Sequence, residues 1–188
     1  MNIMIVGVGG QGTLLASRIL GSIFLSTGAD VKVSEVHGMS QRGGSVVTYV
    51  KVADKVHAPT IEEQGADFIL AFEQLEALRW IKYIKKDGII IANNQKIDPM
   101  PVITGADVYP ENVFDKIKSQ GINIVELNAL DIAEAAGSSK AVNVVLIGAF
   151  AKYTNIEYNI WIDTIKNLVP SKFIDLNIKA FDSGYNSK

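Results

Sequence analysis

The feature that most constrains the fold is a short apolar run that ends in glycines. Residues 3–6 are all apolar, and the chain continues as Gly7-Val8-Gly9-Gly10-Gln11-Gly12. The run predicts a buried parallel strand over residues 2–6. The glycines permit a tight turn and a close backbone approach to a ligand.

A helix is expected directly after this turn. Residues 13–27 carry apolar side chains at near-helical spacing, and Gly28 is a plausible stop. Such a helix points its free N–H groups and positive dipole end at the turn, which is a natural site for phosphate. Strand, turn and helix therefore predict an α/β fold with a candidate anion site. A tight turn that binds nothing is the alternative interpretation.

A second glycine-rich segment follows the next apolar run, which predicts a strand over residues 31–36. It reads Ser34-Glu35-Val36-His37-Gly38-Met39-Ser40-Gln41-Arg42-Gly43-Gly44. Arg42 offers a planar guanidinium suited to phosphate or carboxylate, and the glycines let backbone amides approach a ligand. We expect the two loops to leave the carboxyl edges of neighbouring strands and to lie side by side.

The candidate binding residues come from these two loops. They are Gly7, Gly9, Gly10, Gln11 and Gly12 in the first, and Glu35, His37, Ser40, Gln41, Arg42, Gly43 and Gly44 in the second. No catalytic residue is predicted, because no Ser, Cys or Asp is marked as a partner for His37. No metal ligand is predicted either.

Residues 45–52 predict another strand, only about nine residues after the second. A parallel crossover needs about a dozen residues or more, so this strand is expected to run antiparallel to a neighbour. The fold class predicted is α/β, a three-layer Rossmann-like and mostly parallel sheet. It has one antiparallel strand, residues 45–52, and helices on both faces.

The remainder of the chain continues the α/β pattern. Pro99 and Pro101 oppose regular structure in residues 93–104, Pro110 suits an early helical position, and Asn143 could cap a buried helix. Ser171 could cap the last helix and Gly184 could end it. Further strands are expected at 67–71, 89–92 and 122–127, and further helices at 72–84, 113–120, 130–136, 143–153, 160–168 and 171–183.

Composition limits the function. The chain has 188 residues, which suits a single domain, and its formal net charge of −2 gives no basic field for nucleic acid. It has no cysteine, which excludes disulfides, cysteine-ligated zinc, iron–sulfur clusters and a thiol nucleophile within this chain. No apolar run approaches the ~20 residues of a membrane span, so a cytoplasmic protein is expected.

Glu35 supports a second interpretation. It lies a little over 20 residues beyond Gly12, where a dinucleotide-binding fold places the carboxylate that binds a ribose hydroxyl. A self-sufficient NAD- or flavin-dependent oxidoreductase is therefore a legitimate alternative. The short gap before Ser45 counts against it, as does the lack of an acid–base set. A third possibility is a purely structural clamp subunit.

The chain resembles the gamma-type subunit of 2-oxoacid:ferredoxin oxidoreductases over essentially its whole length. The resemblance is carried by both glycine-rich segments, by Tyr109-Pro110, by residues 143–148 and by residues 177–181. The second loop is most similar to that of indolepyruvate ferredoxin oxidoreductase beta subunits. The resemblance implies that residues 1–188 form a single gamma-type domain.

The resemblance also implies a function shared with other polypeptides. Such enzymes oxidatively decarboxylate an aryl pyruvate with coenzyme A, make an aryl-acetyl-CoA and carbon dioxide, and pass electrons to ferredoxin. Thiamine diphosphate, magnesium and iron–sulfur clusters would belong to a larger alpha subunit, which is the expected partner. This chain would bind no cofactor alone, would be inactive alone, and would help to form the coenzyme A region through its two loops.

Overall fold

The computed structural model describes residues 1–37 and 43–187. It contains one six-stranded sheet in the order β2-β3-β1-β4-β5-β6. Strands β1, β4, β5 and β6 run parallel, and β3 runs antiparallel to both of its neighbours. The strands are β1 (Asn2–Val8), β2 (Asp30–His37), β3 (Ser45–Ala53), β4 (Ala66–Ala71), β5 (Ile84–Asn93) and β6 (Asn123–Leu127).

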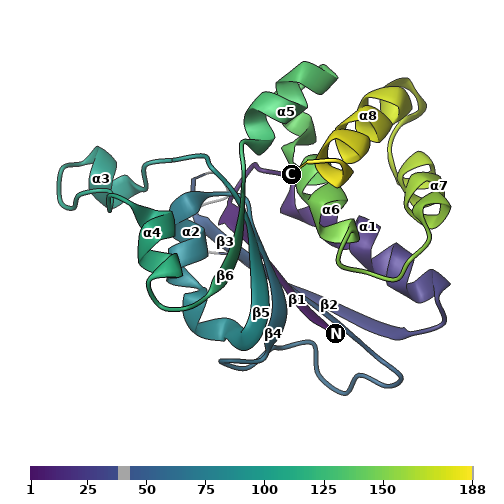
Figure 1. The fold of residues 1–188 in the computed structure, drawn as a ribbon, viewed down its shortest axis with the longest axis horizontal. Helices are drawn as coiled ribbons and strands as arrows, with labels where there is room; N and C mark the ends of the chain where they lie inside the picture. The colour runs from purple at the N-terminus through teal and green to yellow at the C-terminus, as the bar shows by residue number, and fades with distance from the viewer. Residues whose placement is uncertain (38–42, 188) are drawn as a thin grey trace.

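Helices cover both faces of the sheet (Figure 1). One face packs against α1 (Thr13–Ser26), α5 (Ala129–Ala136), α6 (Val142–Ala151), α7 (Tyr158–Leu168) and α8 (Ile174–Tyr185). The opposite face packs against α2 (Gln74–Arg79) and α4 (Val113–Lys118). Alternate β1 side chains supply the two cores, Ile3 and Ile5 to the first and Met4 and Val6 to the second. The predicted fold class is confirmed.

The antiparallel strand β3 changes which strands are neighbours in the sheet. β3 inserts between β1 and β2. The two strands that lead into the glycine loops were expected to be neighbours, and they are not. β2 is antiparallel to β3 and β3 is antiparallel to β1, so β2 and β1 run the same way. Their carboxyl ends therefore still meet at one edge of the sheet.

The predicted helix over residues 72–84 is wrong in extent. α2 ends at Arg79, a short 3-10 turn (Ile81–Tyr83) follows, and β5 already begins at Ile84, which pairs with Ala66 of β4. Sheet pairing overrides the helical spacing of the apolar residues there. Likewise, residues 93–104 contain one helical turn, α3 (Met100–Ile103), which begins directly after Pro99.

Four predicted helix ends also need correction. Pro110 precedes α4, whose N-cap is Asn112. Asn143 lies inside α6, which begins at Val142. Ser171 belongs to a 3-10 turn before α8. Gly184 lies within α8 and does not end it; a Cβ there would lie 2.0 Å from the Val145 carbonyl oxygen on α6, so glycine serves helix packing.

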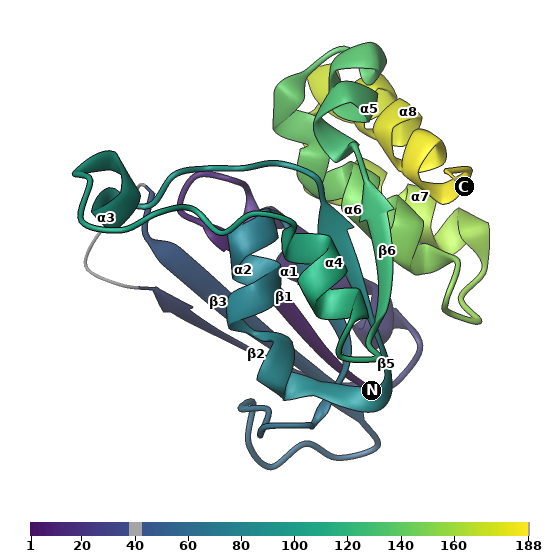
Figure 2. The same cartoon turned by 60° about the vertical axis from the view of Figure 1, so that its left-hand side comes forward.

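The connection between β5 and α4 carries α3 away from the body as a projecting arm (Figure 2). We call residues 96–109 the α3 arm. Its turn is closed by backbone bonds, among them those from the N–H groups of Ala106 and Asp107 to the carbonyl of Pro101. No helix in residues 1–37 and 43–187 is long and apolar enough to cross a membrane.

Candidate functional site

The first glycine loop turns sharply between β1 and α1. Gly10 and Gly12 have φ angles of 103° and 85°, a region that L side chains rarely adopt. Gly12 is the N-cap of α1, and no side chain caps this helix end. The N–H groups of the first helical turn have no carbonyl partner within the helix. The backbone thus presents donors and a positive dipole end at the sheet edge.

Gln11 has a structural role within this loop. Its Oε1 accepts a hydrogen bond from the Val8 N–H at 2.9 Å, and its Nε2 donates to the Phe72 carbonyl at 3.0 Å and to Gln95 Oε1 at 3.3 Å. A Cβ on Gly7 would lie 2.8 Å from Gln11 Oε1. Gly7, which lies inside β1 and not in the turn, therefore leaves space for the side chain that ties β1 to β4.

Gly12 contacts the start of α6. Asn143 Nδ2 donates to the Gly12 carbonyl at 3.2 Å, and a Cβ on Gly12 would lie 2.7 Å from that nitrogen. The Asn143 side chain is buried, and its Oδ1 accepts from the Val144 N–H at 2.9 Å. The first loop is thus fixed by residues far away in the sequence.

The described end of the second glycine loop lies against the first. The Gly9 N–H donates to the Gly44 carbonyl at 2.9 Å, and the Gly43 N–H donates to the Gly9 carbonyl at 3.4 Å. These bonds extend the β1–β3 ladder beyond its last pair, Val8 with Ser45. Gly43 has a φ angle of 72°. The predicted juxtaposition of the two loops therefore holds for Gly9, Gly43 and Gly44.

A cavity of about 400 Å³ opens beside these loops. It is lined by Gly9, Gly10, Gly12, Thr13, Leu14, Glu35, His37 and Val46. Glu35 is paired in register with Thr48, whose hydroxyl donates to Glu35 Oε2 at 3.2 Å. The strand register places Glu35 and His37 on the α1 face of the sheet. The cavity thus has backbone donors on one wall and a carboxylate on another.

A second cavity, of about 490 Å³, lies on the other side of the first loop. Gly10, Gln11 and Gly12 line it together with Leu15, Gln95, Leu130, Ser139, Lys140, Val142 and Asn143. Sequence analysis did not connect Gln95, Ser139 or Lys140 with the glycine loops. No local pattern marks these residues, because only the strand order, with β4 between β1 and β5, and the packing of α6 on the sheet bring them to the loop.

A buried carboxylate, Glu73, lies at the same edge of the sheet. Glu73 is 1% exposed and accepts from the N–H groups of Glu76 at 2.9 Å and Ile97 at 3.1 Å, and from the Tyr109 hydroxyl. Burial and the bond to Glu73 raise the pKa of Tyr109 far above its usual range. Tyr109-Pro110 therefore has a structural role at the root of the α3 arm.

The predicted site residues fall into three groups. Gly9, Gly10, Gly12, Glu35 and His37 share one cavity, and Gly43 and Gly44 adjoin it through Gly9. Gly7 and Gln11 support the turn from within. Ser40, Gln41 and Arg42 lie outside the described residues. Within residues 1–37 and 43–187, no group of three or more His, Asp or Glu is gathered to hold a metal ion.

Comparison with known proteins tests the resemblance. A model of the pyruvate ferredoxin/flavodoxin oxidoreductase family matches residues 2–187. The chain is 41% identical over 190 residues to the indolepyruvate oxidoreductase subunit IorB of Archaeoglobus fulgidus. That match covers 99% of this chain and 94% of the relative. The resemblance to indolepyruvate oxidoreductase subunits is confirmed.

Solved structures share the fold. The pyruvate oxidoreductase subunit PORC of Thermotoga maritima has a TM-score of 0.75 at 21% identity, covering 100% of this chain and 96% of that one. A 2-oxoglutarate:ferredoxin oxidoreductase from Magnetococcus marinus, with 2-oxoglutarate, coenzyme A and succinyl-CoA bound, has a TM-score of 0.72 at 19% identity. The match covers 98% of this chain and 30% of that one. From the family model and the relative at 41% identity, the chain belongs to the pyruvate ferredoxin/flavodoxin oxidoreductase family.

Proposed function

We propose that this chain is a non-redox subunit of a heteromeric 2-oxoacid ferredoxin oxidoreductase that acts on aryl pyruvates such as indolepyruvate. The overall reaction combines the 2-oxoacid with coenzyme A, releases carbon dioxide and aryl-acetyl-CoA, and transfers two electrons to ferredoxin. The names of the relatives support this substrate class. The chain has no cysteine, so its partner must supply the ligands of any iron–sulfur cluster.

The cavity between the two glycine loops is the proposed coenzyme A region, and it is the observation that carries the proposal. Coenzyme A carries a pyrophosphate and a 3′-phosphate, which favour a helix N-terminus with exposed N–H groups. The uncapped start of α1 and the glycines at 10 and 12, both with positive φ angles, form one wall of this cavity. A solved enzyme that contains this fold in 30% of its chain has coenzyme A bound. Gln41 and Arg42 are proposed to complete the region.

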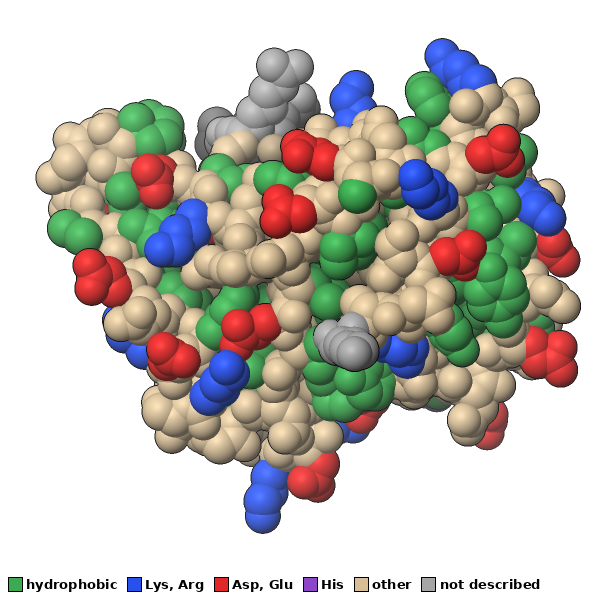
Figure 3. All heavy atoms as spheres, turned by 45° about the horizontal axis from the view of Figure 1, so that its top comes forward, with side chains coloured by type: hydrophobic (Ala, Val, Ile, Leu, Met, Phe, Trp, Pro, Cys, Tyr) green, Lys and Arg blue, Asp and Glu red, His purple; other side chains and the backbone are tan. Residues whose placement is uncertain are grey.

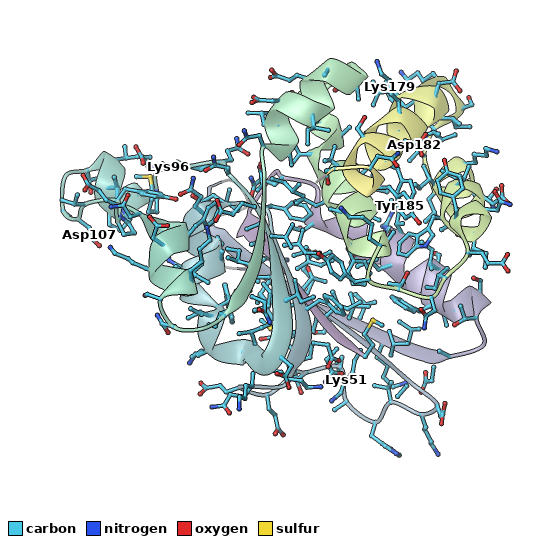
Figure 4. All side chains as sticks on the ribbon, in the orientation of Figure 1. Lys51, Lys96, Asp107, Lys179, Asp182 and Tyr185 are labelled. Carbon is cyan, nitrogen blue, oxygen red and sulfur yellow. The ribbon has the colours of Figure 1, made fainter. Side chains whose placement is uncertain are left out.

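The second part of the proposal is assembly with the catalytic subunit. Met100, Ile103 and Val108 are 63%, 65% and 82% exposed, and all three lie on the α3 arm. Figure 3 shows hydrophobic side chains together with acidic ones at that end of the molecule, and Figure 4 labels Lys96 and Asp107 on the arm. Apolar side chains gathered on a projecting element commonly mark a protein interface. We assign this one to the catalytic subunit.

Reconstitution tests the proposal. The purified chain alone should not reduce ferredoxin or viologen with indolepyruvate, and addition of its catalytic partner should give coenzyme A-dependent reduction. Gly10→Ala should raise the KM for coenzyme A, because a methyl group would enter the cavity where the backbone meets the ligand. Gly28→Ala is the matched control, since Gly28 has a φ angle of 86° and open space around it. Turnover by the chain alone would contradict the proposal.

A dinucleotide-binding oxidoreductase is the second candidate, because Glu35 lines the same cavity as the glycine turn. Fluorescence titration with NADH distinguishes the two. Saturable binding that Glu35→Gln abolishes would favour the dinucleotide, whereas competition by coenzyme A alone would favour the first proposal. Loss of assembly with unchanged coenzyme A affinity in loop variants would favour a purely structural clamp.

A further inference from the structure

A buried carboxylate on the far face of the sheet contacts the described end of the second glycine loop. Glu76, on α2, is 1% exposed. Its Oε2 accepts a hydrogen bond from the hydroxyl of Ser45 at 2.5 Å, and Ser45 is the first residue after Gly44. Ser45 also begins β3 and pairs with Val8, the last residue of β1. The carboxylate thus reaches the point where both glycine loops join the sheet.

Helix capping alone does not account for this carboxylate. Glu76 is the third residue of α2, a position from which glutamate commonly bonds back to the N-cap residue. Here the Glu73 side chain accepts from the Glu76 N–H at 2.9 Å, while the Glu76 carboxylate accepts from Ser45, Arg79 and Trp80. The Arg79 Nη1 bond is 2.6 Å and the Trp80 Nε1 bond is 3.2 Å. Three donors compensate the burial of the charge.

We propose that Glu76 is a positioning residue, which acts through Ser45 to hold Gly43 and Gly44 against Gly9. The β1–β3 ladder fixes the backbone direction at this point, but bonds at the end of a ladder open readily. The bond from Ser45 to a fixed, buried carboxylate restrains the strand start from the α2 face, opposite the cavity. This inference rests on the proposed function, because its consequence is the shape of the proposed coenzyme A region.

The test uses Ser45→Ala in the reconstituted complex, with Ser45→Thr as the conservative variant. Ser45→Ala removes one donor and leaves Glu76 bonded to Arg79 and Trp80, so the fold should persist. We expect hydrogen exchange at the amides of Gly9 and Gly43 to rise about tenfold, the size expected for one hydrogen bond to a charged group. The KM for coenzyme A should rise several-fold with kcat within about twofold, and Ser45→Thr should restore both. Ser119→Ala is the control, since its hydroxyl bonds the Lys116 carbonyl on α4, away from both glycine loops.

The outcomes separate this inference from the proposed function. Faster exchange together with a raised KM, each returned to its original value in Ser45→Thr, supports the positioning role and the coenzyme A assignment. Faster exchange with an unchanged KM supports the positioning role and contradicts the coenzyme A assignment. Unchanged exchange in Ser45→Ala overturns the positioning role, whatever the kinetics. Glu76→Gln is a second test of the positioning role. It keeps the shape of the side chain but removes its charge, so hydrogen exchange at the amides of Gly9 and Gly43 should again rise.

Discussion

At the residue scale, the glycines of the first loop have different reasons to be glycine. Gly12 needs both a left-handed φ angle and space for the buried Asn143 side chain. Gly10 needs the left-handed angle, but no atom of residues 1–37 and 43–187 lies within 4 Å of where its Cβ would be. Gly7 needs space for Gln11. The spacing of the glycines predicted a ligand site, yet only some residues of the motif line the cavity.

We predict that Gly12→Ala destabilises the chain more than Gly28→Ala. Both residues have nearly the same φ angle, 85° and 86°, so both alanines incur the left-handed penalty of about 1 kcal/mol. Only Gly12→Ala also displaces Asn143, which should add about 1 kcal/mol through the lost bond to the Gly12 carbonyl. Urea denaturation of the two variants measures the difference. Equal losses would show that Asn143 adapts freely.

Residue types alone could not separate binding residues from supporting ones. Gln11 was predicted to bind a ligand because it lies in the motif, but its amide bonds Val8, Phe72 and Gln95. Those partners come from β1 and from the residues that follow β4 and β5. Their proximity depends on the strand order, which no local pattern contains.

At the element scale, α6 and α8 pack in close contact at two glycines. A Cβ on Gly148 would lie 2.2 Å from the Phe181 carbonyl oxygen, and one on Gly184 would lie 2.0 Å from that of Val145. The two helices therefore cross backbone to backbone. A glycine within a helix that is apolar all round favours close packing, but the sequence pattern does not identify the partner helix.

We predict that Gly148→Ala lowers the free energy of unfolding by about 3 kcal/mol, because the helices must separate to admit a methyl group. Gly21→Ala in α1 is the matched control. Its Cβ would meet only Val33 Cγ2, at 3.6 Å, and alanine should be neutral or stabilising by up to about 1 kcal/mol. Thermal unfolding of both variants decides. A neutral Gly148→Ala would contradict the observed crossing.

Tyr158 links α7 to α8 and makes the contact between these two helices sensitive to high pH. Its hydroxyl donates to Asp182 Oδ1 at 2.5 Å, and this bond, with some burial, raises the pKa of Tyr158 to about 12 (Asp182 is labelled in Figure 4). The neutral phenol is favoured by folding. The stabilisation is therefore complete below pH 10 and is lost as pH rises from about 10 to about 12.

The stability difference between the unmodified chain and Tyr158→Phe should follow this window. It should be constant below pH 9 and should fall through the window, as measured by urea denaturation at each pH. Comparison with Phe removes the contribution of the other tyrosines. A difference that does not change up to pH 12 would show that the bond to Asp182 is not formed in solution.

The presence of most strands and helices could be predicted from the sequence, whereas the order of the strands in the sheet and the ends of the helices could not. Short connection length predicted the antiparallel strand, because too few residues separate His37 from Ser45 for a crossover. The same reasoning could not place β3 between β1 and β2, since either edge of β1 was open to it. The predicted helix over residues 72–84 was too long, because the pairing of Ile84 with Ala66 outweighed the helical spacing of the apolar residues.

At the scale of the whole molecule, the α3 arm and the glycine loops are two surfaces that a partner would cover. Glu73 fixes the root of the arm through Ile97 and Tyr109, while Met100, Ile103 and Val108 remain exposed near its end. A rigid root with an apolar end suits docking into a pocket with little loss of conformational entropy.

We predict that Ile103→Asp weakens assembly with the catalytic subunit at least tenfold and leaves the unfolding of the isolated chain unchanged, because this side chain is exposed. Titration of labelled chain with the catalytic subunit measures the effect. Leu25→Asp is the control, since Leu25 is 57% exposed near the end of α1. Assembly that tolerates Ile103→Asp but not Leu25→Asp would move the interface to α1.

We propose that the cavity between the glycine loops takes part in coenzyme A binding within the assembled enzyme. Photolabelling of the reconstituted complex with a coenzyme A analogue, followed by mapping of the labelled peptides, tests it most directly. We expect label within residues 8–14 and 35–46 of this chain, and its loss when excess coenzyme A competes. Label confined to the partner subunit would show that coenzyme A does not bind at this cavity.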